Sequence, residues 1–173
     1  MRIAGYNPNS FVDFPGNIAA IVFVGGCNLR CWYCHNAEIL DTKEFLSDDA
    51  ILARIKDNFL LDGVVISGGE PTLQPDLFDF AEKLRAIGMQ VKLDTNGMRP
   101  EVVKEGVERG LFDYVAMDVK APFEKYYKVS PTRTADAAKL RETAAYLMGP
   151  DRIPSEFRLP VVPPFEVPDL GEE

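Results

Sequence analysis

Apolar segments alternate with helix-like stretches along this chain. Residues 18–24 and 63–67 are continuous apolar runs bounded by glycine, which is typical of parallel strands buried on both faces. Residues 90–95, 114–120 and 156–162 have the same character. The pattern therefore predicts five buried strands. The segment that precedes them, residues 5–17, is expected to form a short edge strand and a turn.

Helix signals lie between the predicted strands. Ser47 is a candidate N-cap for a helix that presents Ile51, Leu52, Ile55 and Phe59 on one face. Three more helices are expected, from Pro75 to the glycine at 88, from 100 to 110 and from 134 to 148. Strands that alternate with helices indicate an α/β fold with a parallel sheet. We expect one domain over residues 1–163, followed by an acidic, proline-rich tail at 164–173.

Unusual residues follow each predicted strand. A cysteine-rich loop follows the first, the sequence SGGEPT the second and DTNG the third, while Asp118 and Lys120 end the fourth and Arg158 lies on the fifth. In parallel α/β folds, active sites gather at the carboxyl ends of the strands. The sequence therefore predicts a functional site at the rim of the sheet where the carboxyl ends of the strands lie.

Composition narrows the class of protein. The chain has 173 residues, of which 46% are hydrophobic and 27% charged, and its formal net charge is −8. It has no basic stripe, so a nucleic-acid-binding protein is not expected. It has no charged-then-apolar leader, and its longest apolar run is too short to cross a bilayer. We therefore expect a cytoplasmic protein without a membrane partner.

All three cysteines and the single histidine lie within residues 27–35. An odd number of thiols crowded into one loop argues against a disulfide framework and favours a metal site. The spacing C-x3-C-x2-C suits an iron–sulfur cluster with three protein ligands and one open iron. A closed zinc site of Cys27, Cys31, Cys34 and His35 is the alternative, although adjacent side chains seldom reach one metal. Three inert buried thiols are a further alternative.

Several motifs together resemble a known family. The segment CNLRCWYC resembles the signature of the radical S-adenosylmethionine (SAM) enzymes. Within that superfamily SFVDFPG, CHN, SGGEPTLQ, KLDTNG and YVAMDVKAP resemble the glycyl-radical-enzyme activating branch, over about residues 1–163. The likeness is greatest to anaerobic ribonucleoside-triphosphate reductase activating proteins, with pyruvate formate-lyase activating enzymes more distant.

The resemblance implies a fold and a function. It implies a partial (β/α) TIM-type barrel, with about five parallel strands here against (β/α)6 in the family. The expected sixth strand would be absent or supplied by a partner or a second copy. The implied activity is reductive cleavage of SAM to a 5′-deoxyadenosyl radical, which abstracts hydrogen from a glycine of a partner glycyl radical enzyme. Anaerobic ribonucleotide reductase is the expected partner, and flavodoxin or ferredoxin the expected electron donor.

The resemblance also implies roles for individual residues, with no catalytic side chain beyond the cluster and SAM. Cys27, Cys31 and Cys34 would hold a [4Fe–4S] cluster. Asp94, Thr95 and Asp118 would help to hold a monovalent cation. The SAM-binding set would be Tyr33, His35, Ser67, Gly68, Gly69, Glu70, Asp94, Thr95, Asn96, Lys120 and Arg158.

Simpler interpretations of the same residues stay open. SGGEPT is also an ordinary strand–turn–helix connection, and DTNG is also a capping turn. Asp118 and Lys120 share one face of their strand and could form a plain surface ion pair. Two rival functions remain as well: a radical SAM enzyme acting on a small molecule of the deazapurine type, and a metal-binding or electron-transfer module without catalysis.

Overall fold

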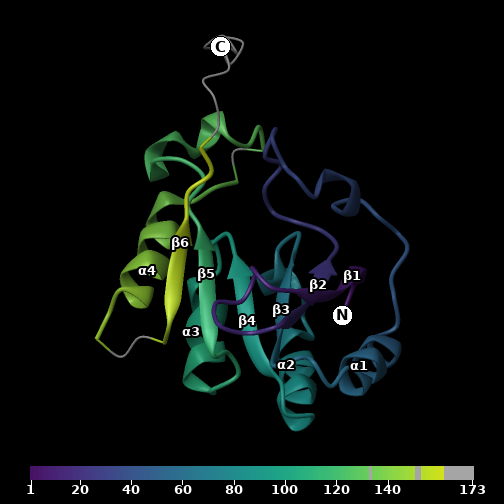
Figure 1. The fold of residues 1–173 in the computed structure, drawn as a ribbon. Coiled ribbons are helices and arrows are strands. Elements are labelled where there is room, and N and C mark those ends of the chain that lie inside the picture. The colour runs from purple at the N-terminus through teal and green to yellow at the C-terminus, as the bar shows by residue number, and fades with distance from the viewer. Residues whose placement is uncertain (133, 151–152, 162–173) are drawn as a thin grey trace.

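The computed structural model describes residues 1–132, 134–150 and 153–161, and a six-stranded sheet forms its centre (Figure 1). The strands lie side by side in chain order from β1 to β6. Their bounds are β1 (Ile3–Ser10), β2 (Ala19–Val24), β3 (Gly63–Gly68), β4 (Gln90–Thr95), β5 (Tyr114–Asp118) and β6 (Ser155–Arg158).

Five of these strands are parallel, as the sequence predicts. Each of β2 to β5 pairs in parallel with the next strand along the chain, so their carboxyl ends meet at one edge of the sheet. The N-terminal segment forms the expected edge strand, β1, which runs antiparallel to β2. This arrangement agrees with the partial barrel expected from the resemblance, with β1 added at one edge.

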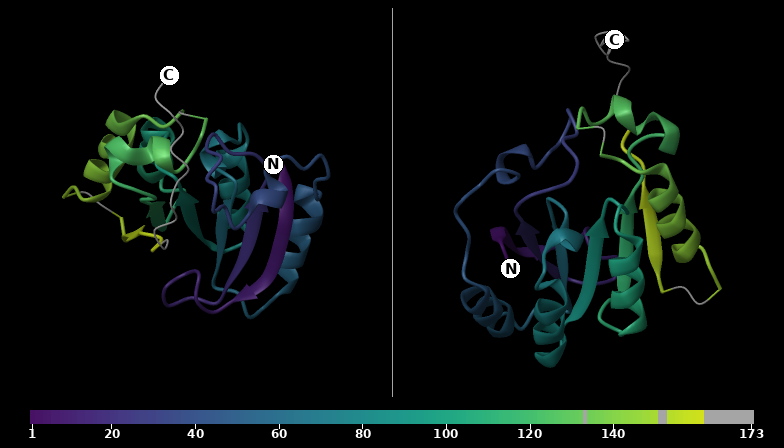
Figure 2. Two further views of the ribbon diagram at one scale, coloured as in Figure 1. Left: turned by 90° about the horizontal axis from the view of Figure 1, so that it is seen from above. Right: turned by 180° about the vertical axis from the view of Figure 1, so that it is seen from behind.

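The helices lie on the outer face of the curved sheet (Figure 2). One α-helix connects each successive pair of parallel strands: α1 (Asp48–Asp57), α2 (Leu77–Ala86), α3 (Pro100–Glu108) and α4 (Ala137–Leu147). Short 3-10 helices occur in the loops as η1 (Ala37–Ile39), η2 (Pro71–Leu73) and η3 (Phe123–Lys128). No helix of the described residues is long and apolar enough to span a membrane.

Successive side chains of each strand point to opposite faces of the sheet, and the two faces differ in chemistry. The main core lies between sheet and helices, where Val22, Ile66 and Leu93 are fully buried against residues such as Phe80 and Leu140. The inner face starts with a smaller apolar cluster of Phe14, Ala19, Ile21 and Val65. Further along the sheet the inner face becomes charged, with Lys92, Asp94, Glu156 and Arg158 linked by ion pairs.

Several predicted boundaries were wrong. Helix α1 ends at Asp57, so Phe59 lies in the following turn, 92% exposed, instead of on the buried helix face. Pro75 precedes helix α2, whose N-cap is Asp76. Strand β6 ends at Arg158, four residues earlier than predicted. Helix α4 starts after Asp136, whose carboxylate accepts hydrogen bonds from the backbone of Ala138 and Lys139. The predicted tail, 164–173, lies outside the described residues.

Candidate cofactor site

A cavity of about 510 Å³ lies at the carboxyl ends of the parallel strands. Its volume is in the range that holds small-molecule ligands and cofactors. The end of every parallel strand contributes to it, as the sequence predicts. The residues that line it and carry a predicted role are Cys27, Cys31, Tyr33, Cys34, His35, Ser67, Gly68, Gly69, Asp94, Thr95, Asn96, Asp118, Lys120 and Arg158.

All three cysteines are free thiols on the wall of this cavity. Burial raises the pKa of Cys27 to about 11 and also raises the pKa of Cys31. Among the described residues, no group of three or more cysteine, histidine, aspartate or glutamate side chains is already arranged to hold a metal ion.

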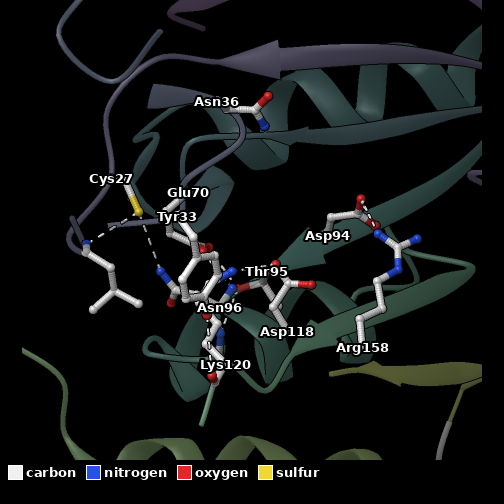
Figure 3. Close-up of polar contacts among 12 residues, drawn as sticks. Cys27, Tyr33, Asn36, Glu70, Asp94, Thr95, Asn96, Asp118, Lys120 and Arg158 are labelled. Atoms are coloured by element: carbon white, nitrogen blue, oxygen red, sulfur yellow. Dashed lines mark hydrogen bonds and ion pairs between the residues drawn. The ribbon is translucent and has the colours of Figure 1, made fainter. Parts of the chain in front are cut away.

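The Cys27 sulfur has two nitrogen donors around it. The backbone N–H of Leu29 lies 3.4 Å from Sγ, and the Asn96 side-chain amide lies 3.7 Å from it (Figure 3). The same amide donates to Asn28 Oδ1 at 2.7 Å, which fixes its orientation. Strand β4 thereby holds the first cysteine of the loop through Asn96.

At Gly68 and Gly69 the backbone at the end of β3 packs directly against the backbone of Val24 and Gly26, which lead into the cysteine loop. A Cβ atom added at Gly69 would lie 1.9 Å from the carbonyl oxygen of Gly26. Gly68 has a φ of +110°, and a Cβ there would lie 2.4 Å from the nitrogen of Val24. Only glycine permits this close approach. The Gly68 carbonyl accepts a hydrogen bond from Asn36 Nδ2 at 3.1 Å.

Glu70 is fully buried and does not line the cavity. Its Oε1 accepts hydrogen bonds from the Thr72 hydroxyl at 2.6 Å and the Thr95 hydroxyl at 2.7 Å. Its Oε2 accepts from the backbone N–H of Asn96 at 2.7 Å. Burial raises the pKa of Glu70, and these hydrogen bonds oppose the rise. Glu70 thus joins the ends of β3 and β4, and its side chain supports the cavity wall from behind.

Asp94 and Arg158 form an ion pair across the inner face, with 2.9 Å between Oδ2 and Nη1 (Figure 3). Arg158 also contacts Glu156, and Lys92 contacts Asp94 from the other side. Burial raises the pKa of Asp94, while the charges of Lys92 and Arg158 oppose the rise. Arg158, predicted to bind SAM, here has the carboxylates of Asp94 and Glu156 as partners.

Asp118 and Lys120 pair with each other at the cavity, with 2.9 Å between Oδ2 and Nζ. Burial alone would lower the pKa of Lys120, but the charges of Asp118 and Cys31 outweigh it and the pKa is raised.

Tyr33 and His35 also lie at the cavity. The Tyr33 hydroxyl donates to the Lys120 carbonyl at 3.3 Å, and burial raises the pKa of Tyr33 to about 12. His35 lies at the cavity with its side chain exposed.

Sequence reasoning missed three contributors to the site. Asn28 and Asn36 orient Asn96 and Gly68, and the hydroxyl of Tyr126 accepts a hydrogen bond from the backbone of Lys120 at 2.9 Å. Asn36 belongs to the segment CHN, so the sequence motif points to this position, although it does not show what the Asn36 side chain contacts. Asn28 and Tyr126 lie in loops whose course no periodic pattern reveals.

Comparison with known proteins decides the family. Residues 21–149 match the family model described as the radical SAM superfamily. The chain belongs to this superfamily. It is 43% identical over 126 residues to a protein of Methanocaldococcus jannaschii assigned as a glycyl-radical enzyme activating enzyme, covering 72% of this chain and 52% of that protein. It is 35% identical over 125 residues to 7-carboxy-7-deazaguanine synthase of Neisseria meningitidis, covering 72% and 54%.

The fold has a solved counterpart, and the relatives are longer. A structure of TYW1 with a lysine–pyruvate adduct bound superposes with a TM-score of 0.59 at 16% identity, covering 82% of this chain and 54% of that one. At this identity the likeness shows the fold alone. The chain spans about half the length of the two curated relatives.

The residues of the site fit the cofactors of the radical SAM superfamily, a [4Fe–4S] cluster and SAM. Three free thiols share one wall of a cavity, and no other cysteine exists in the chain to supply a fourth ligand. Beside them Gly68 and Gly69 line the cavity, together with charged groups of both signs. Such backbone and charged groups can contact the amino-acid part and the nucleoside part of SAM.

Proposed function

We propose that this chain is the radical SAM core of a glycyl-radical-enzyme activating enzyme. The observation that carries the proposal is the set of five strand ends around one cavity, in a chain with 43% identity to an assigned activating enzyme. The match to the deazaguanine synthase covers the same share of this chain at lower identity, 35%.

Each part of the cavity has a proposed task. Cys27, Cys31 and Cys34 hold the cluster. A reduced cluster held there would supply the one electron that cleaves SAM to methionine and a 5′-deoxyadenosyl radical, and this radical would take the hydrogen atom from a glycine of the partner. The cavity is lined on the SAM side by the proposed residues Tyr33, His35, Ser67, Gly68, Gly69, Asp94, Thr95, Asn96, Lys120 and Arg158.

Supporting side chains keep these groups in place. Asn96 and the backbone of Leu29 orient the Cys27 sulfur. Glu70 fixes the Asn96 backbone from behind the wall, so its proposed contribution to SAM binding is indirect. Such fixed donors and charges need no reorganisation when the ligand binds.

Leu159 and Pro160, which follow strand β6, also line the cavity. The proposed substrate is a polypeptide loop of the partner that carries the target glycine. Anaerobic ribonucleotide reductase is our proposed partner, and flavodoxin or ferredoxin the proposed electron donor.

The test is anaerobic reconstitution followed by incubation with SAM, a reductant and candidate glycyl radical enzymes. Electron paramagnetic resonance should show a glycyl radical on the partner, and iron analysis about four irons per chain. The Cys31→Ala variant should lose both the cluster and SAM cleavage. SAM cleavage that persists in this variant would overturn the cluster assignment.

A second candidate acts on a small molecule of the deazapurine class. The observation that favours it is the 35% identity to 7-carboxy-7-deazaguanine synthase over 72% of the chain. The same reconstituted protein distinguishes the two candidates. A glycyl radical on a partner supports the first, whereas consumption of a deazapurine precursor without any partner supports the second.

A further inference from the structure

A lysine is buried in the middle of strand β4. Lys92 has no exposed surface, and its side chain lies on the inner face of the sheet. Its Nζ contacts Asp94 Oδ1 at 3.1 Å and Glu156 Oε1 at 3.2 Å, and it donates to the carbonyl of Asp13. The ring of Tyr114 lies 5.5 Å from it. The ammonium therefore lies within ion-pair distance of two carboxylates and has the Asp13 carbonyl as its hydrogen-bond acceptor. Asp94 Oδ1 accepts no hydrogen bond from the described residues, so the Lys92 charge is its compensation.

Lys92 closes a ring of alternating charges. Asp94 lies between Lys92 and Arg158, and Glu156 lies between the same two cations, with 2.8 Å between its Oε1 and Arg158 Nη2. Two cations balance two carboxylates. Burying a lysine is costly unless it is paired in this way. An apolar residue at position 92 would pack at lower cost, but it would leave Asp94 with Arg158 alone.

The residues expected to hold a monovalent cation are already engaged. Asp94 and Thr95 are consecutive on a strand, so their side chains point to opposite faces (Figure 3). The Thr95 hydroxyl donates to Glu70 Oε1 at 2.7 Å, and Asp118 pairs with Lys120. A metal cation beside Asp94 Oδ1 would have to displace the Lys92 ammonium. These side chains do not fit a bound cation in this arrangement.

We propose that Lys92 is the built-in counter-cation of Asp94 and takes the place of a monovalent metal ion at this site. The ammonium neutralises Asp94 on one side while Arg158 neutralises it on the other. Through the Asp13 carbonyl it also ties the loop after β1 to the inner face. SAM binding by this chain then requires neither potassium nor sodium.

The first experiment varies the salt. Potassium, sodium and tetramethylammonium chlorides are compared at equal ionic strength, because tetramethylammonium is too large for a carboxylate-lined site. The melting temperature of the cluster-free chain and the SAM affinity of the reconstituted chain, from anaerobic equilibrium dialysis, should be the same in all three. A SAM affinity that falls tenfold or more in tetramethylammonium overturns the proposal.

The second experiment is a double-mutant cycle on the cluster-free chain. Lys92→Met keeps the length of the side chain but leaves Asp94 short of one cation, and should lower the melting temperature by roughly 10 °C. The double variant with Asp94→Asn should recover part of this loss. Lys83→Met, on the exposed side of α2, is the matched control and should change little.

The cycle stays decisive even if Lys92→Met does not fold. A double variant that folds, or melts higher than Lys92→Met, shows that the unbalanced Asp94 charge caused the loss. If the double variant is no more stable than Lys92→Met, or if Lys92→Met melts with the wild type, the proposal is wrong. The cycle measures melting temperatures alone, so its failure is distinct from failure of the proposed function, on which the SAM-affinity measurement rests.

Discussion

The side-chain amide of Asn96 lies 3.7 Å from the sulfur of Cys27, and Asn28 holds it there at 2.7 Å. The two residues come from different strand ends, 69 positions apart in the chain. Hydrogen bonds to cysteine sulfur help to set the potential of an iron–sulfur cluster, because they stabilise the more negative, reduced form.

Asn96→Ala should therefore lower the reduction potential of the reconstituted cluster. A hydrogen bond with a net value of about 0.5–1.5 kcal/mol corresponds to roughly 20–60 mV for one electron. The measurement is an anaerobic redox titration followed by electron paramagnetic resonance. Asn9→Ala, an exposed asparagine on β1, is the control. An unchanged potential in Asn96→Ala would show that the amide does not act on the sulfur.

Gly69→Ala should disrupt the cysteine loop. The added Cβ would lie 1.9 Å from the Gly26 carbonyl oxygen, so either the end of β3 or the loop must move. We expect a loss of about 1–3 kcal/mol in the free energy of unfolding and a lower iron content after reconstitution. Gly5→Ala is the control, because a Cβ there meets Phe23 at an ordinary 3.5 Å. Normal iron content in Gly69→Ala would contradict the close packing.

Glu70→Gln should destabilise the cluster-free chain. The donors around Glu70, from Thr72, Thr95 and Asn96, all need an acceptor, and an amide presents one N–H toward them. An unsatisfied buried group costs about 1–3 kcal/mol, so the free energy of unfolding from urea titration should fall by this amount. Glu108→Gln, on the exposed side of α3, should leave it unchanged. Equal stability of the two variants would mean that Glu70 is not the link between β3 and β4.

The strands and the rim were predictable because periodic apolar runs and glycine stops carry that information locally. Residues 90–95 match β4 without error. Phe59 shows where the pattern fails: it has helical spacing, but the chain leaves the helix at Asn58 and the ring is exposed. Spacing cannot reveal where tertiary packing ends a helix.

The long-range partners of charged residues were not predictable. Asp94 lies two residues from Lys92 on the same face of β4, but Glu156 meets Lys92 only when β4, β5 and β6 assemble. Arg158 is predicted to bind SAM, and the sequence does not show that Asp94 and Glu156 lie within reach of it. Long-range ion pairs depend on register, which a single sequence does not specify.

The thiol of Cys27 should remain protonated at neutral pH in the cluster-free chain, because burial raises its pKa to about 11. Only the thiolate reacts with an alkylating agent. The alkylation rate should therefore rise about tenfold per pH unit from pH 7 to about pH 10, whereas a free cysteine, with a pKa of about 8.5, levels off earlier. Trypsin cleaves after Arg30 and separates Cys27 from Cys31 and Cys34, so mass spectrometry can follow it alone. Restricted access of the alkylating agent to Cys27 would slow the reaction equally at every pH. The test is therefore the pH at which the alkylation rate stops rising. A plateau near pH 9 would show that the thiol is not shifted.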